Sequence, residues 1–73
     1  MEPNDPVVAQ IGETAGAVWQ ALMADGPMSV AKLVREVDAP RDTVMQALGW
    51  LAREGKLMVS ETSRGRLVQL RGE

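Results

Sequence analysis

Several polar side chains in one short segment are of the types that bind nucleic-acid bases: Arg41, Thr43, Gln46 and Arg53. An arginine can form two hydrogen bonds with a guanine edge, and a glutamine can do the same with adenine. One interpretation is therefore that Arg41, Thr43 and Gln46 contact bases. The competing interpretation is that these are ordinary solvated side chains, because Asp42 lies among them and would repel phosphate.

Arg64 and Arg66, on either side of a glycine, could bind a phosphate or enter a minor groove. The net charge of the segment that contains these arginines is positive, as phosphate binding requires. Residues 41–73 hold six bases and four acids, a net charge of +2, whereas residues 1–40 hold two bases and six acids, a net charge of −4. The positive excess is small for a protein that binds DNA without sequence preference.

The composition excludes several kinds of catalytic and metal-binding site. The chain has no histidine and no cysteine, so it lacks a histidine base, a cysteine nucleophile and a Cys/His zinc site. Ser29 and Thr43 have no partner base, and there is no glycine-rich phosphate loop. We therefore expect a protein that is not an enzyme and that uses neither a cofactor nor a metal.

The length of 73 residues and the hydrophobic fraction of 45% indicate one small folded domain with a marginal core. No apolar run approaches the roughly 18 residues of a membrane span. The segment Met1 to Pro6 is acidic and lacks the basic start of a signal peptide. We expect a cytoplasmic protein that does not contact a membrane.

Residues 6–25 predict a long helix. Asp5 is a suitable N-cap, Pro6 suits the first helical position, and Gly26 followed by Pro27 ends the helix. One apolar face recurs at steps of three and four residues: Val8, Ile11, Ala15, Val18 and Leu22. Three more apolar residues widen this face: Val7, Trp19 and Met23.

Two further helices follow a short strand at Met28. Ser29 caps the second helix, and Asp38-Ala39-Pro40 breaks it, since proline pushes the preceding residue away from helical angles. Its apolar residues are Val30, Leu33, Val34 and Val37. The third helix is predicted from about Arg41 to Glu54, with Gly55 as its C-cap. Its core face comprises Val44, Ala47, Leu48 and Leu51.

A β-hairpin is predicted after the third helix. Residues 57–62 and 66–70 form its strands, and Ser63-Arg64-Gly65 forms the turn. In the first strand, the alternation places Leu57 and Val59 on the buried face. The resulting order, α-α-α-β-β, is mainly α with a small β-hairpin (α+β). We expect a single helix-turn-helix domain over residues 1–73, with frayed ends at 1–5 and 71–73.

The chain resembles the winged helix-turn-helix superfamily over nearly its whole length. Two segments look more closely like a small stand-alone bacterial and archaeal winged-helix family of uncharacterised function. They are Ala47-Leu48-Gly49-Trp50-Leu51-Ala52-Arg53-Glu54-Gly55-Lys56 and Gly16-Ala17-Val18-Trp19. The Gly-Trp-Leu-Ala-Arg-Glu hexapeptide is the more specific part. The resemblance implies three helices with a hairpin wing and, at most, DNA binding. In winged helices, side chains near the start of the third helix reach base edges.

Trp50 has three interpretations. The favoured one places its indole against Leu57 or Val68 of the wing, as part of the core. A second makes it an exposed anchor for another protein, because tryptophan is enriched at interface hot spots. The third, and the least favoured, is stacking on nucleic-acid bases, since no other aromatic residue lies near it.

Small residues on two helices could mark an interface. Met45, Gly49 and Ala52 share one face of the third helix, and Gly12 and Gly16 share a side of the first. A helical glycine costs about 1 kcal/mol relative to alanine, so it usually has a packing reason. The favoured reason is packing within the domain, and the alternative is a symmetric dimer.

Two functional hypotheses remain. The first is a DNA-binding module, acting as a homodimeric transcriptional regulator, with the third helices in successive major grooves of double-stranded DNA and the wings on flanking phosphate. The second is a protein interaction and dimerisation module that keeps the winged-helix shape without binding DNA. The first is slightly favoured by analogy of fold.

Overall fold

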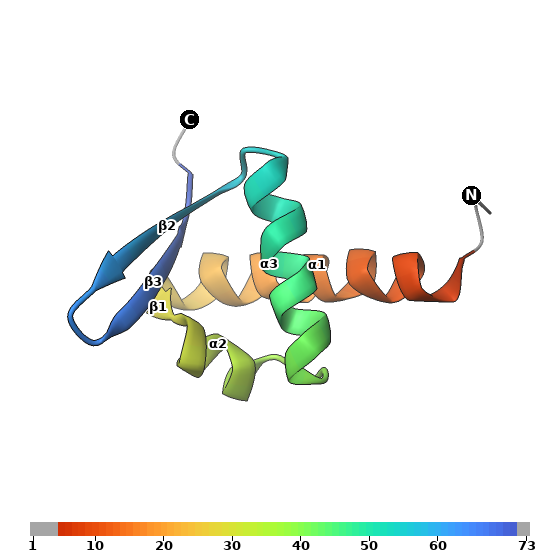
Figure 1. The fold of residues 1–73 in the computed structure, drawn as a ribbon, viewed down its shortest axis with the longest axis horizontal. Helices are drawn as coiled ribbons and strands as arrows, with labels where there is room; N and C mark the ends of the chain where they lie inside the picture. Colours follow the sequence, from red (N-terminus) through yellow and green to blue (C-terminus); the bar gives the residue numbers. More distant parts are fainter. Residues whose placement is uncertain (1–4, 72–73) are drawn as a thin grey trace.

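The computed structural model describes residues 5–71, and its elements follow the predicted order (Figure 1). The three helices are α1 (Pro6–Asp25), α2 (Val30–Glu36) and α3 (Arg41–Arg53). The three strands are β1 (Met28–Ser29), β2 (Leu57–Thr62) and β3 (Gly65–Leu70). The prediction of a mainly α fold with a small hairpin is confirmed, and the expected strand at Met28 is β1.

The helix ends are set by local hydrogen bonds at residues suited to them. The Asp5 carboxylate accepts a hydrogen bond from the Val7 amide at 2.9 Å, and the Ser29 hydroxyl accepts one from the Lys32 amide at 3.1 Å. Gly55, with φ 76°, follows the end of α3, which lies at Arg53 and not at Glu54. The predicted N-caps, Asp5 and Ser29, are thus confirmed. Gly55 was expected to be the C-cap of α3, but the C-cap is Glu54 and Gly55 is the residue after it.

The expected frayed ends of the chain are described only in part. Asp5 caps α1, and the Arg71 amide donates to the Lys56 carbonyl at 3.0 Å. Residues 1–4 and 72–73 lie outside the described residues.

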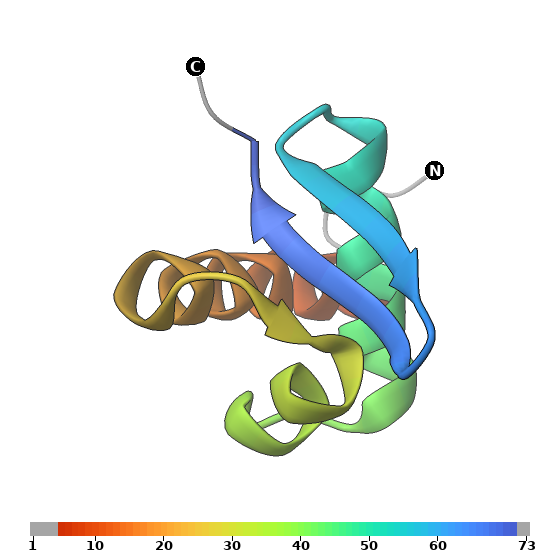
Figure 2. The same ribbon diagram turned by 90° about the vertical axis from the view of Figure 1, so that its left-hand side faces the viewer.

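The strands form one antiparallel sheet in the order β1-β3-β2. Val68 of β3 lies between Met28 of β1 and Val59 of β2. The β2–β3 hairpin forms the wing and projects from the helices (Figures 1 and 2). The second wing strand begins at Gly65, one residue before the predicted start.

A single core joins the helices to the sheet. In Figures 1 and 2, α3 crosses the long α1 steeply. The buried apolar residues come from all six elements and the adjoining turn: Ala15, Val18, Leu22, Met28, Leu33, Val37, Val44, Ala47, Leu48, Leu51, Leu57 and Val68. The predicted core face of α3 is confirmed in full.

Two expectations about burial were wrong. Val59 is 45% exposed, because the hairpin extends beyond the helices that cover Leu57 at its base. Three residues expected to widen the buried face of α1 are exposed: Val7 (55%), Trp19 (41%) and Met23 (59%). Trp19 and Met23 lie at the edge of the buried face, beside hollows that Leu51 and Leu70 also line. Val7 lies in the first turn of α1, which extends beyond α3 (Figure 1).

Candidate nucleic-acid interface

Three arginines from two parts of the chain line one groove. Arg41 is the first residue of α3, and Arg64 and Arg66 belong to the hairpin. The groove has a volume of about 320 Å³, and its remaining walls are Ser29, Val30, Ala31, Met45 and Gly65. All three arginines are exposed. Several arginines around one space suit a phosphate, since a guanidinium group can donate two parallel hydrogen bonds to phosphate oxygens. We call this space the basic groove.

The hairpin tip holds Arg64 through local hydrogen bonds. The Thr62 hydroxyl donates to the Gly65 carbonyl at 2.9 Å and accepts from the Arg64 amide at 3.2 Å. Gly65 has φ 133°, a backbone conformation that residues with a side chain rarely adopt. The turn therefore has a defined conformation that presents the Arg64 side chain to solvent.

Arg66 is the one arginine of the basic groove with an acidic partner among the described residues. Its Nε lies 3.5 Å from Oε2 of Glu61, which is its cross-strand neighbour. The two side chains are 57% and 78% exposed, and exposed pairs of this kind contribute about 0–1 kcal/mol. The pair is therefore weak enough for a phosphate to compete with Glu61 for Arg66.

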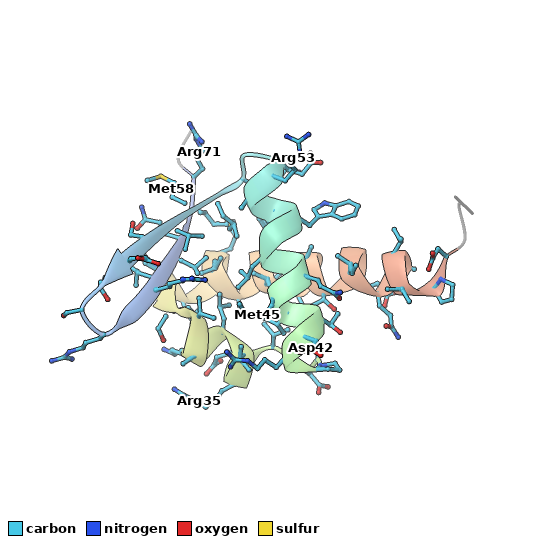
Figure 3. The ribbon with its side chains drawn as sticks, in the orientation of Figure 1. Arg35, Asp42, Met45, Arg53, Met58 and Arg71 are labelled. Carbon is cyan, nitrogen blue, oxygen red and sulfur yellow. The ribbon has the colours of Figure 1, made fainter. Side chains whose placement is uncertain are left out.

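The outward face of α3 is less suited to DNA binding than the side of α3 that lines the basic groove. Asp42, Gln46, Gly49 and Arg53 follow one another at helical spacing and are all exposed. Figure 3 shows Asp42 and Arg53 near opposite ends of the helix. Gln46 and Arg53 can donate hydrogen bonds, whereas Asp42 repels phosphate and Gly49 has no side chain. The positive charge therefore lies mainly where α3 meets the wing.

Thr43 faces a different part of the surface from Arg41. It is half-buried and lines a hollow with residues of α1 and of the α2–α3 turn: Gln10, Glu13, Thr14, Asp38, Ala39 and Pro40. Two steps along a helix turn the side chain by about 200°, which accounts for the separation. The structure does not bring Thr43 together with the arginines of the basic groove.

An apolar cleft continues from the basic groove. It has a volume of about 220 Å³ and lies between α3 and the inner face of the wing. Its walls are Val30, Met45, Leu48, Gly49, Ala52, Val59, Arg66 and Val68. Val30, Met45 and Arg66 line both spaces, and Figure 3 shows Met45 on the lower half of α3. Three of the predicted interface residues, Met45, Gly49 and Ala52, thus lie together beside the arginines.

The favoured prediction for Trp50, packing against the wing, is wrong. Trp50 is 43% exposed and does not line the cleft between α3 and the wing. The residue facing the wing at this level is Gly49, and each step along the helix turns the side chain by about 100°. Trp50 therefore remains available as an exposed contact residue.

The favoured explanation for the helical glycines is also wrong. A Cβ atom at Gly12, Gly16 or Gly49 would have no other atom within 4 Å, apart from its own helix and neighbours. Close packing within the domain therefore does not explain why these residues are glycine. The alternative, an intermolecular contact, remains.

Sequence reasoning missed one wall of the basic groove. Ser29 and Val30, at the start of α2, were considered as a cap and as a core residue, and Ala31 was given no role. Their place in the groove depends on how the wing folds over α2, and no local pattern in the sequence signals this.

Two negative findings concern residues 5–71. Within that range, no three acidic side chains gather closely enough to hold a metal ion. None of the described helices combines the length and the apolar character needed to cross a membrane.

Comparison with known proteins gives three matches. A family model described as "Winged helix-turn-helix domain (DUF2582)" matches residues 5–70. The chain is 34% identical over 65 residues to "Uncharacterized protein MJ1608" of Methanocaldococcus jannaschii, covering 85% of this chain and 91% of that protein. The solution NMR structure of protein BT2368 from Bacteroides thetaiotaomicron is similar at a TM-score of 0.75 and 31% identity. That match covers 85% of this chain and 76% of the other.

Proposed function

The chain belongs to the family of winged helix-turn-helix domains, and from this premise we propose that it binds double-stranded DNA as a homodimeric transcriptional regulator. The wing and the edge of α3 bind phosphate. Gln46 and Arg53, on the outward face of α3, reach the bases. The observation that supports this proposal most is the meeting of Arg41, Arg64 and Arg66 on one groove.

The proposed contacts explain how a chain with a net charge of −2 can approach DNA. Phosphate binding depends on local positive charge, and it releases counterions for each phosphate that is neutralised. The basic groove supplies three such charges. The contact set is small, so the expected affinity for generic DNA is low.

The test compares two arginine reversals that change the net charge equally. Arg64→Glu removes a charge from the basic groove, whereas Arg71→Glu, the control, changes an exposed residue after β3 that does not line it. Figure 3 shows Arg71 at the end of the sheet away from the hairpin tip. Fluorescence anisotropy with labelled duplex DNA over a series of salt concentrations gives affinity and salt dependence together.

We expect Arg64→Glu to weaken binding and to reduce the slope of log K against log salt by about 0.9, the value for one phosphate contact. Arg71→Glu should leave that slope unchanged. Equal effects of the two variants would mean that only the net charge matters, and the proposed site would be wrong.

A second function is favoured by the apolar cleft beside the arginines and by the exposed Trp50. In this alternative, the same surface binds a protein with both apolar and acidic side chains. The titration separates the two functions. A protein-binding module without a DNA function would give no change in anisotropy at low salt, where contacts with phosphate are strongest.

A further inference from the structure

The apolar cleft between α3 and the wing reaches the core of the domain. Two of the residues that line it, Leu48 and Val68, are 7% and 0% exposed and belong to the hydrophobic core, whereas Val59 is 45% exposed. Figure 2 shows the wing passing across α3. An apolar molecule in the cleft would therefore contact core side chains and cover an apolar side chain that water now reaches.

The space in the cleft is large enough for a small apolar molecule. Gly49 and Ala52 of α3 line it, and a Cβ atom at Gly49 would meet no atom within 4 Å outside its own helix and neighbours. The cleft volume of about 220 Å³ exceeds the volume of about 150 Å³ of an engineered protein cavity that binds benzene. The cleft therefore accommodates one aromatic ring with a short substituent.

The charge around the cleft identifies the kind of molecule that fits. Arg66 lines both the cleft and the basic groove, where Arg41 and Arg64 join it. No acidic side chain lines either space in the part of the chain that the structure describes. The exposed partner of Arg66, Glu61 at 3.5 Å, is held only weakly. An anionic group is therefore the complement of this end of the cleft.

We propose that the apolar cleft and Arg66 together form a binding site for a small aromatic carboxylate. The ring lies in the cleft beside Met45, Gly49 and Val59. The carboxylate lies at the border with the basic groove and accepts two parallel hydrogen bonds from Arg66 in place of Glu61. The cleft and the groove share Val30, Met45 and Arg66 as walls, so the ligand must carry its charge directly beside its apolar part.

Occupation of this site has a consequence for DNA binding, and this consequence alone rests on the proposed function. Arg66 is one of the three arginines proposed to bind phosphate. A carboxylate bound to Arg66 removes that contact, because the guanidinium group is then already paired with an anion. The ligand therefore acts as an effector that lowers the affinity of the chain for DNA.

The first test is a titration of the isotope-labelled chain with phenylpropionate, without DNA, followed by two-dimensional NMR. Phenylpropionamide, which has the same shape without the charge, and acetate, which has the charge without the ring, are the matched controls. We expect saturable shift changes at millimolar phenylpropionate, centred on the amides of Met45, Gly49, Ala52, Val59 and Arg66. The amide should bind about tenfold more weakly, the loss expected for a hydrogen bond to a charged group.

Acetate should give no saturable change at the residues of the cleft, because it has no apolar part to fill the space. Two results would overturn the proposal. One is the absence of saturable changes with phenylpropionate, which would leave the cleft to a protein side chain or to water. The other is equal affinity for phenylpropionate and its amide, which would mean that Arg66 does not recognise the charge.

The second test places a larger side chain in the cleft. Ala52→Leu is compared with the control Ala17→Leu, since both positions are exposed and helical but Ala17 does not line the cleft. Alanine and leucine are both good helix formers, so both variants should stay folded. We expect Ala52→Leu to weaken phenylpropionate binding by about tenfold, the effect of about 1.4 kcal/mol. Equal affinities of the two variants would contradict the assigned position of the ring.

The third test reads the contact between the carboxylate and Arg66 as a preference. Arg66→Gln should bind phenylpropionate and phenylpropionamide equally well. The control Arg71→Gln, which changes an exposed arginine outside the cleft, should keep the preference for the acid. This ratio does not change when a variant merely loosens the fold, because both ligands use the same apolar space. A preference that survives in Arg66→Gln would overturn the role of Arg66.

The two proposals fail in different ways. If phenylpropionate binds the cleft of a chain that does not bind DNA, only the proposed function is wrong. If the chain binds DNA but not phenylpropionate, only the ligand site is wrong. If both bind, saturating phenylpropionate should lower the slope of log K against log salt by about 0.9, the value for one phosphate contact. An unchanged slope would contradict the competition at Arg66.

Discussion

Arg41 at the start of α3 and Arg64 at the tip of the hairpin line the same groove, although α3 and β2 separate them in the chain. Their meeting depends on the order β1-β3-β2, in which β3 returns from the hairpin and pairs with β1 next to α2. The groove is therefore a product of the tertiary fold, and it is expected to disappear if the wing detaches.

Arg41→Glu should weaken DNA binding without unfolding the domain. The variant places an acid at the first position of α3, where a negative charge interacts favourably with the helix dipole by about 0.3–1 kcal/mol. Thermal unfolding should therefore occur at the wild-type temperature or slightly above it. The salt slope should fall by about 0.9. A variant that unfolds more easily but binds DNA normally would contradict both the position of Arg41 at the start of α3 and its proposed contact with phosphate.

Asp42→Asn should strengthen DNA binding and weaken the fold. Asp42 lies in the first turn of α3, so its charge stabilises the helix by about 0.3–1 kcal/mol. The same charge faces outward, where it would repel phosphate. Removing a repulsion of about 1 kcal/mol, the value for unit charges 4 Å apart in water, raises affinity about fivefold. Calorimetry and a DNA titration on the same sample would measure both changes, and weaker binding would exclude α3 from the interface.

Two glycine-to-alanine variants, one within α3 and one just after it, should change stability in opposite directions. Gly49 lies within the helix with open space around its Cβ position, so Gly49→Ala should stabilise the fold by about 0.5–1 kcal/mol. Gly55 has φ 76°, and Gly55→Ala should destabilise it by about 1–2 kcal/mol. Urea unfolding of both variants measures the difference. Changes of the same sign would contradict either the helical conformation of Gly49 or the positive φ of Gly55.

The cross-strand pair Val59 and Val68 should respond unequally to truncation. Val68 is fully buried between β1 and β2, whereas Val59 is 45% exposed. Val68→Ala should cost about 2 kcal/mol, from two buried methyl groups at about 0.8 kcal/mol each and the cavity left behind. Val59→Ala should cost less than about 1 kcal/mol, as at other exposed positions. Chemical denaturation would test this, and equal losses would mean that the wing is packed more deeply than described.

The N-caps and the core face of α3 could be predicted because they depend on nearby residues. Asp5 and Ser29 act within one helical turn of their own position, and the apolar spacing of α3 matches its buried face residue by residue. The same local reasoning supports the resemblance to winged helices, which the family match confirms.

The features that depend on the direction of the wing could not be predicted in this way. Trp50 was expected to lie against the wing, but the hairpin crosses α3 on the side of Met45, Gly49 and Ala52. Val59 was expected to be buried, but its strand runs beyond the helices. Both outcomes follow from the pairing of β3 with β1, a contact between distant parts of the chain.

The glycines of α1 illustrate a different limit. The sequence showed that Gly12 and Gly16 needed a packing partner, but it did not show whether that partner lay inside the domain. Only the open space around both positions excludes the internal explanation. The same applies to Trp19, which the apolar pattern assigned to the core and the structure leaves 41% exposed.

Binding of duplex DNA in the basic groove is tested most directly by a low-salt titration of the isotope-labelled chain, followed by two-dimensional NMR. Non-specific binding should appear at about 10⁻⁴–10⁻⁶ M. The predicted result is a set of chemical-shift changes centred on the amides of Arg41, Gln46, Arg64 and Arg66. No changes at these residues up to millimolar DNA would contradict the account and would favour a protein partner for the apolar cleft.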